Sequence, residues 1–572
     1  MTRLSTTHLA FAATVAATIF SNFAIASEAT WIWGSKKAHQ SAPVGECEFQ
    51  RSVTFDADPQ AVIIEVAVDN HFTLRVNNRY VTSSNDVSQT TRIDVTPLIH
   101  KGENVFYLLC RNEDGPAGFR GRIVVTDSDG AVTEIGTDEN WQAKLQRAGT
   151  WDPTIRQRTP WHKPFVLGTS NMEPWASVVK EPTTTDVVKA RAKSDGPFEL
   201  RDGDRVVLLG NTFIERSQRY GFVELALTRR YPDRNVVFRN LGWSGDTVFG
   251  EARARFGSVE QGFQHLETQV HLVEPTLILV AYGANAAFTG PSGIEPFIAG
   301  YERLLNAIET TGARITLVSP LKHESLGPPL PDQSKYNRDL QLYSRAIRQL
   351  AERRSLGFLD LYDPFANRTT GPEFLTDNGM HFTEVGYRYV AEAIEGGLGI
   401  TRETPKITIE SSSLKSSADN AAVSQIEKTD SGIEFTASLA SLPLPTLAEA
   451  NASPAFTLSV RGLAEGEYKV MCGEEALATA TSQQIADGVK ILQGPDHEQS
   501  ELLRETIVKK NELFFHRWRP QNETYLFLFR KHEQGNNAVE IPRFDPLVEA
   551  EEAKIAVLRT PQPNRYRIAS PR

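Results

Sequence analysis

Cysteine is scarce in this sequence. Three occur among 572 residues, Cys47, Cys110 and Cys472. An odd and widely spaced set does not indicate a disulfide framework, and no cysteine or histidine spacing typical of a metal site is present. Cys47 and Cys110 fall in one predicted domain and could pair, although two buried thiols are an equal alternative. We therefore expect no metal centre and no disulfide-stapled fold.

Long apolar runs and basic stretches are also missing. After the first 26 residues, no segment approaches the roughly 20 apolar residues that a membrane span needs. The 61 Lys and Arg side chains are outnumbered by 71 Asp and Glu, which leaves a net charge of −10. Because such a surface repels phosphate backbones, we expect no nucleic-acid partner, and we expect no stable membrane insertion.

Residues 1–26 have the pattern of a signal peptide. Arg3 is the one ionised side chain among them, residues 9–20 are mostly apolar, and Ala24-Ile25-Ala26 has the small-x-small form of a cleavage site. The sequence predicts export, to the periplasm or beyond, with a mature chain that begins near Ser27. An uncleaved N-terminal anchor is the alternative.

The rest of the chain is too long for one core and divides by pattern. Residues 29–175 carry short alternating runs punctuated by turn signals, which predicts a β-sandwich. Residues 176–198 lack an apolar period and are interpreted as a linker. Residues 199–400 alternate strands with helical patterns, which predicts a parallel sheet covered on both faces. Residues 401–572 predict a small β unit followed by helices, without an assigned role.

Several elements are predicted closely enough to test. One helix is expected over residues 215–230, and a loop over the polar residues 411–424. The strands expected in the central domain are 206–209, 236–238, 277–281, 315–319 and 358–361. The later elements expected are strands at 433–437, 456–460 and 468–471 and helices at 499–515 and 549–558.

Four short blocks fall at successive strand ends of the central domain. They are Gly210-Asn211-Thr212, then Trp243-Ser244-Gly245-Asp246-Thr247, then Gly283-Ala284-Asn285-Ala286, and last Asp377-Asn378-Gly379-Met380-His381. In this order they resemble the motifs of the SGNH hydrolases, the GDSL-type esterases and lipases. The resemblance covers residues 199–400 and implies a flavodoxin-like α/β fold and ester hydrolysis without a metal or organic cofactor.

The resemblance also implies roles for these residues. Thr212 takes the place of the nucleophilic serine, and His381 acts as base and then as acid. The Gly245 N–H and the Asn285 amide complete an oxyanion hole with the amide of residue 212. The candidates to orient His381 are Asp377 and Asn378. Three weaker candidates for substrate contact are Asn211, Tyr282 and His323.

The sequence departs from the family pattern at two of these positions. Thr212 keeps the hydroxyl but adds a β-methyl that restricts χ1 and crowds an incoming carbonyl. Asn378 stands where the family has a carboxylate, and an amide cannot stabilise an imidazolium by charge. The residues of these blocks also allow purely structural roles; Thr212, for example, could cap the helix that follows it. A degenerate hydrolase retained for binding therefore stays open, as does a lipase or thioesterase.

The first domain resembles a second known family. The phrases VAVDNHFTLRVNNRYV and DVTPLIHKGENVFYL are similar to the galactose-binding-like jelly rolls that accompany exported glycoside hydrolases. That resemblance implies glycan binding, with Trp141, Trp151 and Trp161 as stacking platforms, against the alternative that they pack in a core. Together with the signal-peptide pattern, the two resemblances predict an exported carbohydrate O-acyl esterase, most simply an O-acetyl esterase, acting on an acylated polysaccharide or a small ester.

Overall fold

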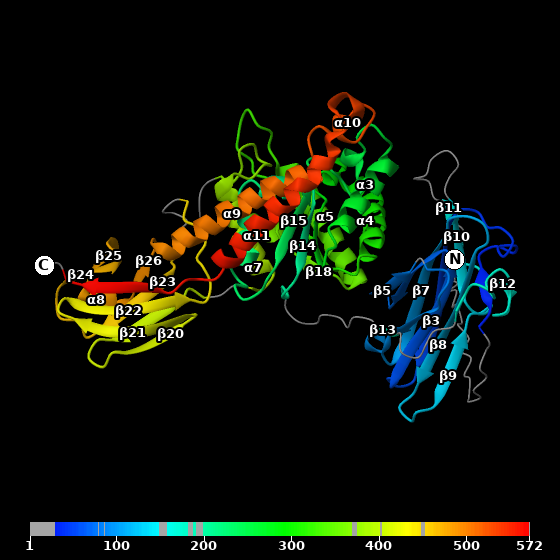
Figure 1. The fold of residues 1–572 in the computed structure, drawn as a ribbon, viewed down its shortest axis with the longest axis horizontal. Helices are drawn as coiled ribbons and strands as arrows, with labels where there is room; N and C mark the ends of the chain where they lie inside the picture. Colours follow the sequence, from blue (N-terminus) through cyan, green and yellow to red (C-terminus); the bar gives the residue numbers. More distant parts are fainter. Residues whose placement is uncertain are drawn as a thin grey trace, which may run out of the picture. The chain divides into compact units, whose positions relative to one another are not determined.

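The structure is a computed structural model of the chain. It divides into two compact units, one formed by residues 1–77 and 81–192 and the other by 78–80 and 193–572 (Figure 1). The predicted signal peptide, Trp151 and most of the predicted linker lie outside the described residues. The residues that the structure describes are 29–77, 79–84, 86–147, 157–158, 160–180, 187–189, 198–368, 374–400, 403–447 and 452–570.

The first unit consists of two mostly antiparallel sheets that share one apolar core. The first sheet has the order β12 (Phe165–Gly168), β1 (Trp31–Trp33), β8 (Gly118–Thr126), β3 (Ala61–Asp69), β6 (Thr91–Asp94) and β13 (Val187–Lys189), with β9 (Val132–Gly136) beside β8. The second has the order β11 (Gln157–Arg158), β10 (Gln142–Arg147), β2 (Gly45–Phe55), β7 (Gly102–Asn112), β4 (His71–Val76) and β5 (Arg79–Ser84).

Two sequence-based expectations are decided in this core. Cys47 and Cys110 lie opposite each other on β2 and β7, both buried and both free thiols. Trp141 is 1% exposed and packs edge-on against Phe119, so its prediction as a stacking platform is wrong. Its indole instead fills the space between the sheets, as large aromatic side chains commonly do. Trp161 is 37% exposed and remains a candidate.

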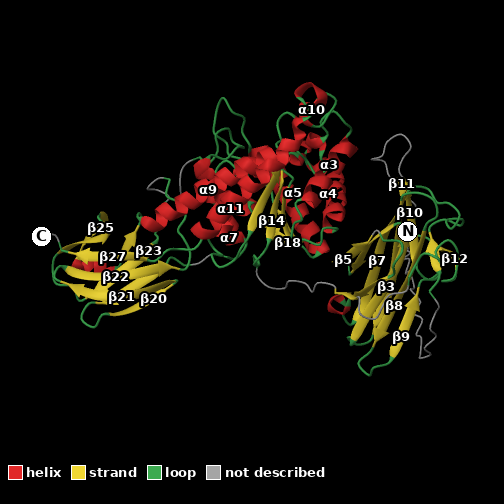
Figure 2. Ribbon diagram, in the orientation of Figure 1, coloured by secondary structure: helices red, strands yellow, loops and turns green. Residues whose placement is uncertain are grey.

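The second unit is built around an all-parallel sheet (Figure 2). In chain order its strands are arranged 2-1-3-4-5, so the connections that leave the first and third strands run toward opposite edges of the sheet. The strands in spatial order are β15 (Val237–Gly242), β14 (Arg205–Gly210), β16 (Leu277–Ala281), β17 (Arg314–Val318) and β18 (Gly357–Leu359).

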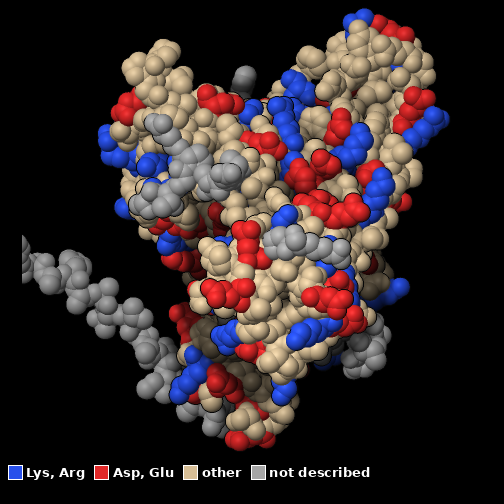
Figure 3. All heavy atoms as spheres, turned by 90° about the vertical axis from the view of Figure 1, so that its left-hand side faces the viewer, with Lys and Arg blue, Asp and Glu red and all other residues tan. Residues whose placement is uncertain are grey.

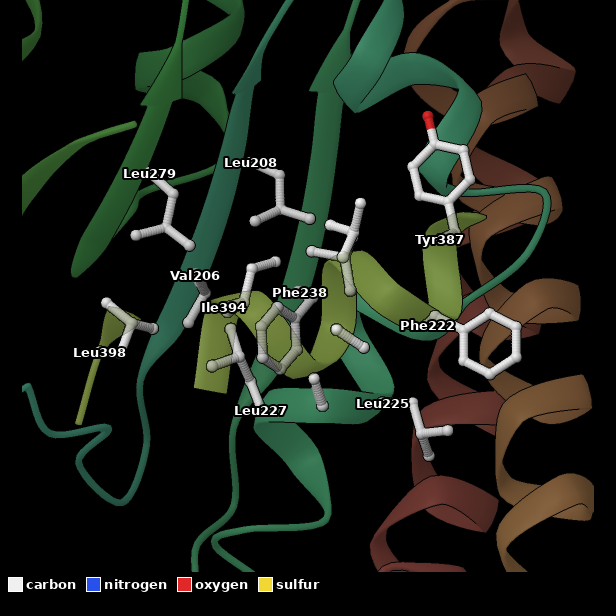
Figure 4. Close-up of a cluster of buried hydrophobic side chains, with 14 of the residues drawn as sticks. Val206, Leu208, Phe222, Leu225, Leu227, Phe238, Leu279, Tyr387, Ile394 and Leu398 are labelled. Carbon is white, nitrogen blue, oxygen red and sulfur yellow. The ribbon is translucent and has the colours of Figure 1, made fainter. Parts of the chain in front are cut away.

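Both faces of this sheet are buried, because apolar residues run continuously along its strands. In β14, Val206 and Leu208 face a cluster with α2 and α7, whereas Val207 and Leu209 face α3, α4 and α5. Figure 4 shows the first cluster, with Leu208, Phe238 and Ile394 drawn together. The helices are α1 (Thr212–Ser217), α2 (Phe222–Thr228), α3 (Val259–Leu272), α4 (Ile294–Glu309), α5 (Ser334–Arg354), α6 (Tyr362–Ala366) and α7 (Glu384–Gly397).

The single helix predicted over residues 215–230 is wrong. The structure has two helices, α1 and α2, separated at Gly221. Gly221 has φ of +72°, the left-handed conformation that ends helices and that glycine adopts without strain. The apolar spacing continues across this break because both short helices pack on the same face of the sheet.

The C-terminal region returns to β-structure and then to long helices. The loop predicted over residues 411–424 is wrong, because β20 and the start of β21 occupy it with largely exposed polar side chains. The elements are β19 (Lys406–Glu410), β20 (Lys415–Asp419), β21 (Ala421–Thr429), β22 (Gly432–Leu439), β23 (Phe456–Arg461), β24 (Glu467–Cys472), β25 (Glu475–Thr481), α8 (Ser482–Asp487), β26 (Val489–Ile491), α9 (Pro495–Trp518), α10 (Glu523–Leu526), α11 (Asp545–Leu558) and β27 (Asn564–Ala569).

Helix α9 packs along the edge of the parallel sheet. Its Leu503 and Ile507 join the core on one face of the sheet, and its Phe514 and Trp518 join the core on the other. Lys510 donates to the carbonyl of Phe238 on the edge strand β15 at 3.2 Å. The helix thus covers an edge that would otherwise present unpaired backbone groups, and α11 lies beside it (Figure 1).

The described residues contain no helix long and apolar enough to cross a membrane. Figure 3 shows acidic and basic side chains interspersed over one face of the molecule.

Candidate active site

The first three sequence blocks meet at the carboxyl edge of the parallel sheet. Gly210 at the end of β14 pairs in register with Gly242 of β15 and Ala281 of β16. A side chain at Gly242 would collide with the backbone of Glu215, so this glycine allows α1 to pass close to the strand end. Because the chain leaves β14 and β16 in opposite directions, a crevice opens between them, where ligands bind in open α/β sheets.

Thr212 opens helix α1 with its hydroxyl close to the second block. Asn211 is the N-cap and accepts from the Phe213 N–H at 3.3 Å, so the capping role considered for Thr212 belongs to its neighbour. The Thr212 Oγ1 accepts a hydrogen bond from the Gly245 N–H at 3.2 Å. Gly245 has φ of +79°, a conformation that favours glycine over other residues.

Asn285 approaches the same position from the third block. Its Nδ2 donates to the carbonyl of Asp246 at 3.2 Å, which uses one of the two amide hydrogens and fixes the direction of the other. Asp246 itself is buried, where it pairs with Arg253 at 2.6 Å and accepts from the Tyr282 hydroxyl at 2.9 Å. The hydroxyl of Tyr282 is thus directed into the wall of the site.

His381 is held by a turn that Asn378 closes. The Asn378 Oδ1 accepts from the backbone N–H of Met380 at 3.1 Å and of His381 at 2.9 Å. These two donors fix the orientation of the amide, and its Nδ2 lies 3.1 Å from the His381 Nδ1. Because an amide nitrogen only donates, Nδ1 accepts and the neutral ring carries its proton on Nε2.

The Asp377 carboxylate is engaged elsewhere. Its Oδ2 lies 3.3 Å from the Arg216 guanidinium, one turn along α1 from Thr212. Burial and the positive charge of Arg216 lower the pKa of His381 below 6.5, and Asp377 opposes this shift. The carboxylate predicted as a possible partner of His381 therefore acts on the ring through its charge, while Asn378 makes the hydrogen bond.

A cavity of about 160 Å³ collects most of the predicted residues. The predicted residues that line it are Asn211, Thr212, Tyr282, Asn285, His323 and His381. Gly245, Asp377 and Asn378 do not line it, but each contacts a residue that does. Burial lowers the pKa of His323 to about 4, so this second imidazole is neutral near pH 7. The complete lining is Asn211, Thr212, Phe213, Arg216, Ala281, Tyr282, Ala284, Asn285, Phe288, Ser319, Pro320, Leu321, His323, Tyr336, Met380, His381, Phe382 and Tyr387.

Sequence reasoning missed two features of this cavity, Arg216 and the stacked pair of Phe288 and Tyr336. Arg216 lies four residues after Thr212, a spacing that places both on one helix face and could have indicated it. Phe288 is 65% exposed and stacks on Tyr336 with ring centroids 4.2 Å apart, and no sequence signal pairs them.

Among the described residues, no group of three or more His, Cys, Asp or Glu side chains is arranged to hold a metal.

Comparison with solved structures gives distant matches. A gut microbial diltiazem-metabolizing enzyme matches with a TM-score of 0.52 and 16% identity, over 65% of this chain and 99% of that chain. An acetylxylan esterase from Geobacillus stearothermophilus, in a catalytic mutant form, matches with a TM-score of 0.28 and 18% identity, over 36% of this chain and all of that one. At these identities the first match supports the fold alone.

No curated protein matches the sequence. The model of the GDSL-like lipase/acylhydrolase family does match, over residues 210–389. That range begins at Gly210 and includes Thr212, Gly245, Asn285 and His381, the residues that surround the cavity. Residues 210–389 therefore form a GDSL-like lipase/acylhydrolase domain, and the protein is a hydrolase that acts on ester bonds.

Proposed function

We propose that this hydrolase is an exported carbohydrate esterase that removes acetyl or similar acyl groups from a polysaccharide, with Thr212 as its nucleophile. The observation that carries the proposal is the hydrogen bond from the Gly245 N–H to the Thr212 Oγ1, at 3.2 Å, in a cavity shared with Asn285 and His381. A backbone donor beside a hydroxyl is what acyl transfer requires, because the carbonyl oxygen becomes anionic next to the attacking atom.

The reaction runs through an acyl-enzyme. The Thr212 Oγ1 attacks the acyl carbon while His381, in the tautomer with its proton on Nδ1, takes the hydroxyl proton on Nε2. The N–H groups of residue 212, Gly245 and Asn285 bind the oxyanion. The tetrahedral intermediate collapses as His381 returns the proton to the leaving alcohol. Water then attacks the acyl-threonine with His381 again as base, which releases the acid and restores the hydroxyl.

The carbohydrate part of the proposal is supported by an exposed aromatic side chain in the cavity lining. The exposed ring of Phe288 rests on Tyr336, whose hydroxyl donates to the Ala284 carbonyl and holds the pair in place. A flat aromatic face in the same cavity as the nucleophile suits the apolar face of a sugar ring in the alcohol part of the ester. Export is supported by the signal-peptide pattern of residues 1–26.

One observation favours a second function. The amide of Asn378 donates to the His381 Nδ1, which leaves the proton on the nitrogen that must accept one from Thr212. In serine proteases, the equivalent Asp-to-Asn change lowers kcat by about 10⁴ through this tautomer. A protein that binds acylated glycans in the same cavity with little turnover is therefore the competing proposal.

A single pair of assays separates the two. The purified mature protein is expected to release acetate from acetylated xylo-oligosaccharides and p-nitrophenol from the acetate ester, and Thr212→Ala is expected to abolish both. A fluorophosphonate probe should label Thr212. If wild type and Thr212→Ala give the same background rate while both bind the oligosaccharide in calorimetry, the binding function replaces the esterase.

A further inference from the structure

Arg519 reaches the active-site loop from outside the GDSL-like domain. It follows the last residue of α9, more than a hundred positions beyond the end of the family match at residue 389. Its Nη1 lies 2.7 Å from the Glu215 Oε2, and both side chains are mostly buried. The same carboxylate oxygen accepts the Ser244 N–H at 2.6 Å. Arg519 thus binds the carboxylate that holds the second sequence block.

A second contact fixes the residue before Ser244. The Arg519 guanidinium lies 3.6 Å from the centre of the Trp243 ring, and Trp518 packs edge-on against that ring at 5.9 Å. A guanidinium can stack on an indole and donate to a carboxylate at once, because its donors lie in its plane and its faces are free. Arg519 therefore fixes both the ring of Trp243 and the partner of the next peptide N–H.

These contacts bear directly on Gly245. Its N–H belongs to the peptide that follows Ser244, and it points at the Thr212 hydroxyl. Ser244 and Gly245 are themselves exposed, whereas Asp246 after them is buried and pairs with Arg253. A donor to an oxyanion acts only when it is held in place before the charge develops. On the other side of Gly245 from Asp246, the loop obtains that support from Glu215 on α1 and from the end of α9.

We propose that Arg519 is a positioning residue for residues 243–247, the loop that carries the Gly245 N–H of the oxyanion hole. The C-terminal helix α9 thereby completes the active site. The proposal rests on the esterase function argued above. Arg519 does not line the cavity; it acts through Glu215 and Trp243. This assigns a role to a part of residues 401–572 that the sequence left without one.

Kinetics of Arg519→Ala in the full chain test the proposal. We expect kcat for p-nitrophenyl acetate to fall by about tenfold or more, less than the 10² to 10³ that loss of an oxyanion donor costs, while KM changes by less than about twofold. The matched control is Arg517→Ala, in the last turn of the same helix, whose guanidinium pairs with Asp545 at 2.7 Å. Arg517→Ala should keep wild-type kcat. Equal kcat in Arg519→Ala and wild type would overturn the proposal.

Hydrogen exchange gives a readout that needs no turnover. In Arg519→Ala the amides of Ser244 and Gly245 should exchange at least about tenfold faster, while those of α4 stay as in wild type. Arg519→Lys, which keeps the charge but loses the planar stack, should give an intermediate rate and serves if the alanine variant does not fold. Unchanged exchange at Ser244 and Gly245, or equal acceleration in Arg517→Ala, would refute the positioning role. A wild-type protein without esterase activity would refute the esterase proposal. Hydrogen exchange at Ser244 and Gly245 would still test the positioning role of Arg519.

Discussion

The contact between Asn378 and His381 decides how well the site can use Thr212. Asn378→Asp keeps the Oδ1 that accepts the backbone N–H groups and replaces the Nδ2 with an acceptor for Nδ1–H. The ring then carries its proton on Nδ1 and leaves Nε2 free to accept one. We expect kcat for p-nitrophenyl acetate to rise by at least about tenfold, because the reverse change costs about 10⁴ in serine proteases.

The pH dependence of that variant provides its control. His381 must be neutral to act as base, so the rate falls as the pH drops through its pKa. In wild type, burial and Arg216 put that midpoint below 6.5. Asn378→Asp should move the midpoint upward, because a carboxylate favours the imidazolium, whereas Asp377→Asn should move it further down. Identical acidic limbs in all three proteins would show that His381 is not the base.

The stacked pair of Phe288 and Tyr336 in the cavity lining predicts that the enzyme prefers esters whose alcohol part is a sugar. Phe288→Ala should raise KM for acetylated xylo-oligosaccharides by about twofold to tenfold, which corresponds to about 0.5–1.5 kcal/mol, the range expected for an aromatic contact. It should leave the rate with ethyl acetate unchanged. Phe529→Ala is the matched control, since Phe529 is 69% exposed and does not line the cavity. Equal losses with both esters would show that Phe288 only supports the fold.

The sequence predicted which residues form the site better than it predicted the hydrogen-bond and charge partners of those residues. Thr212, Asn285 and His381 could be placed because short motifs at strand ends converge on one sheet edge. The engagement of Asp377 by Arg216 could not be predicted, because it depends on how helix α1 and a loop far from it in sequence approach each other. Tyr282 was predicted near the site and lines it, yet its hydroxyl bonds to the buried Asp246, which only the packed structure reveals.

At the scale of elements, prediction worked where burial is periodic. The strands of the parallel sheet are apolar runs, since both of their faces are covered, and the expected positions agree with β14 to β18 within a few residues. Strands β20 and β21 were missed because exposed polar side chains carry little periodic signal. The division between α1 and α2 depends on the backbone of one glycine, Gly221, which an apolar pattern does not register.

The packing of α9 on the sheet predicts that replacing Lys510 lowers the free energy of unfolding strongly. Lys510 is buried, with its Nζ 2.8 Å from the Glu224 Oε2, and burial lowers its pKa and raises that of Glu224. Lys510→Met would leave the carboxylate buried without a cation, so the free energy of unfolding at pH 7 should fall by about 3–5 kcal/mol. Urea denaturation followed by fluorescence measures this change.

The neighbouring lysine supplies the control. Lys509 pairs with Glu512 on the exposed side of α9, so Lys509→Ala should leave the urea midpoint unchanged. Adding Glu224→Gln to Lys510→Met removes the unpaired charge and should recover part of the loss. Equal midpoints for the Lys510 and Lys509 variants would show that α9 is not docked through this pair.

At the scale of the whole molecule, the two units have separate apolar cores. The cluster around Phe49 and Phe106 belongs to the first unit, and those around Leu208 and Leu209 belong to the second. The sequence predicted a separate N-terminal β domain because its patterning changes from alternation to strand-and-helix repeats, and it treated residues 401–572 as a further region. It did not anticipate that the C-terminal helices join the core of the parallel sheet, since α9 contributes apolar residues to both faces.

Separate cores predict that the catalytic unit works alone on small substrates. A fragment of residues 198–572 contains the cavity and all of α9, so its kcat/KM for p-nitrophenyl acetate should stay within about twofold of the full chain.

If the first unit binds glycan, the kcat/KM of the fragment on acetylated polysaccharide should fall by about tenfold or more, because a tethered binding module raises the local concentration of substrate. Trp161→Ala in the full chain should reproduce that loss on the polymer alone, since this indole is exposed whereas Trp141 is in the core. Equal activity of fragment and full chain on the polymer would exclude a binding role for the first unit and leave substrate choice to the cavity and Phe288.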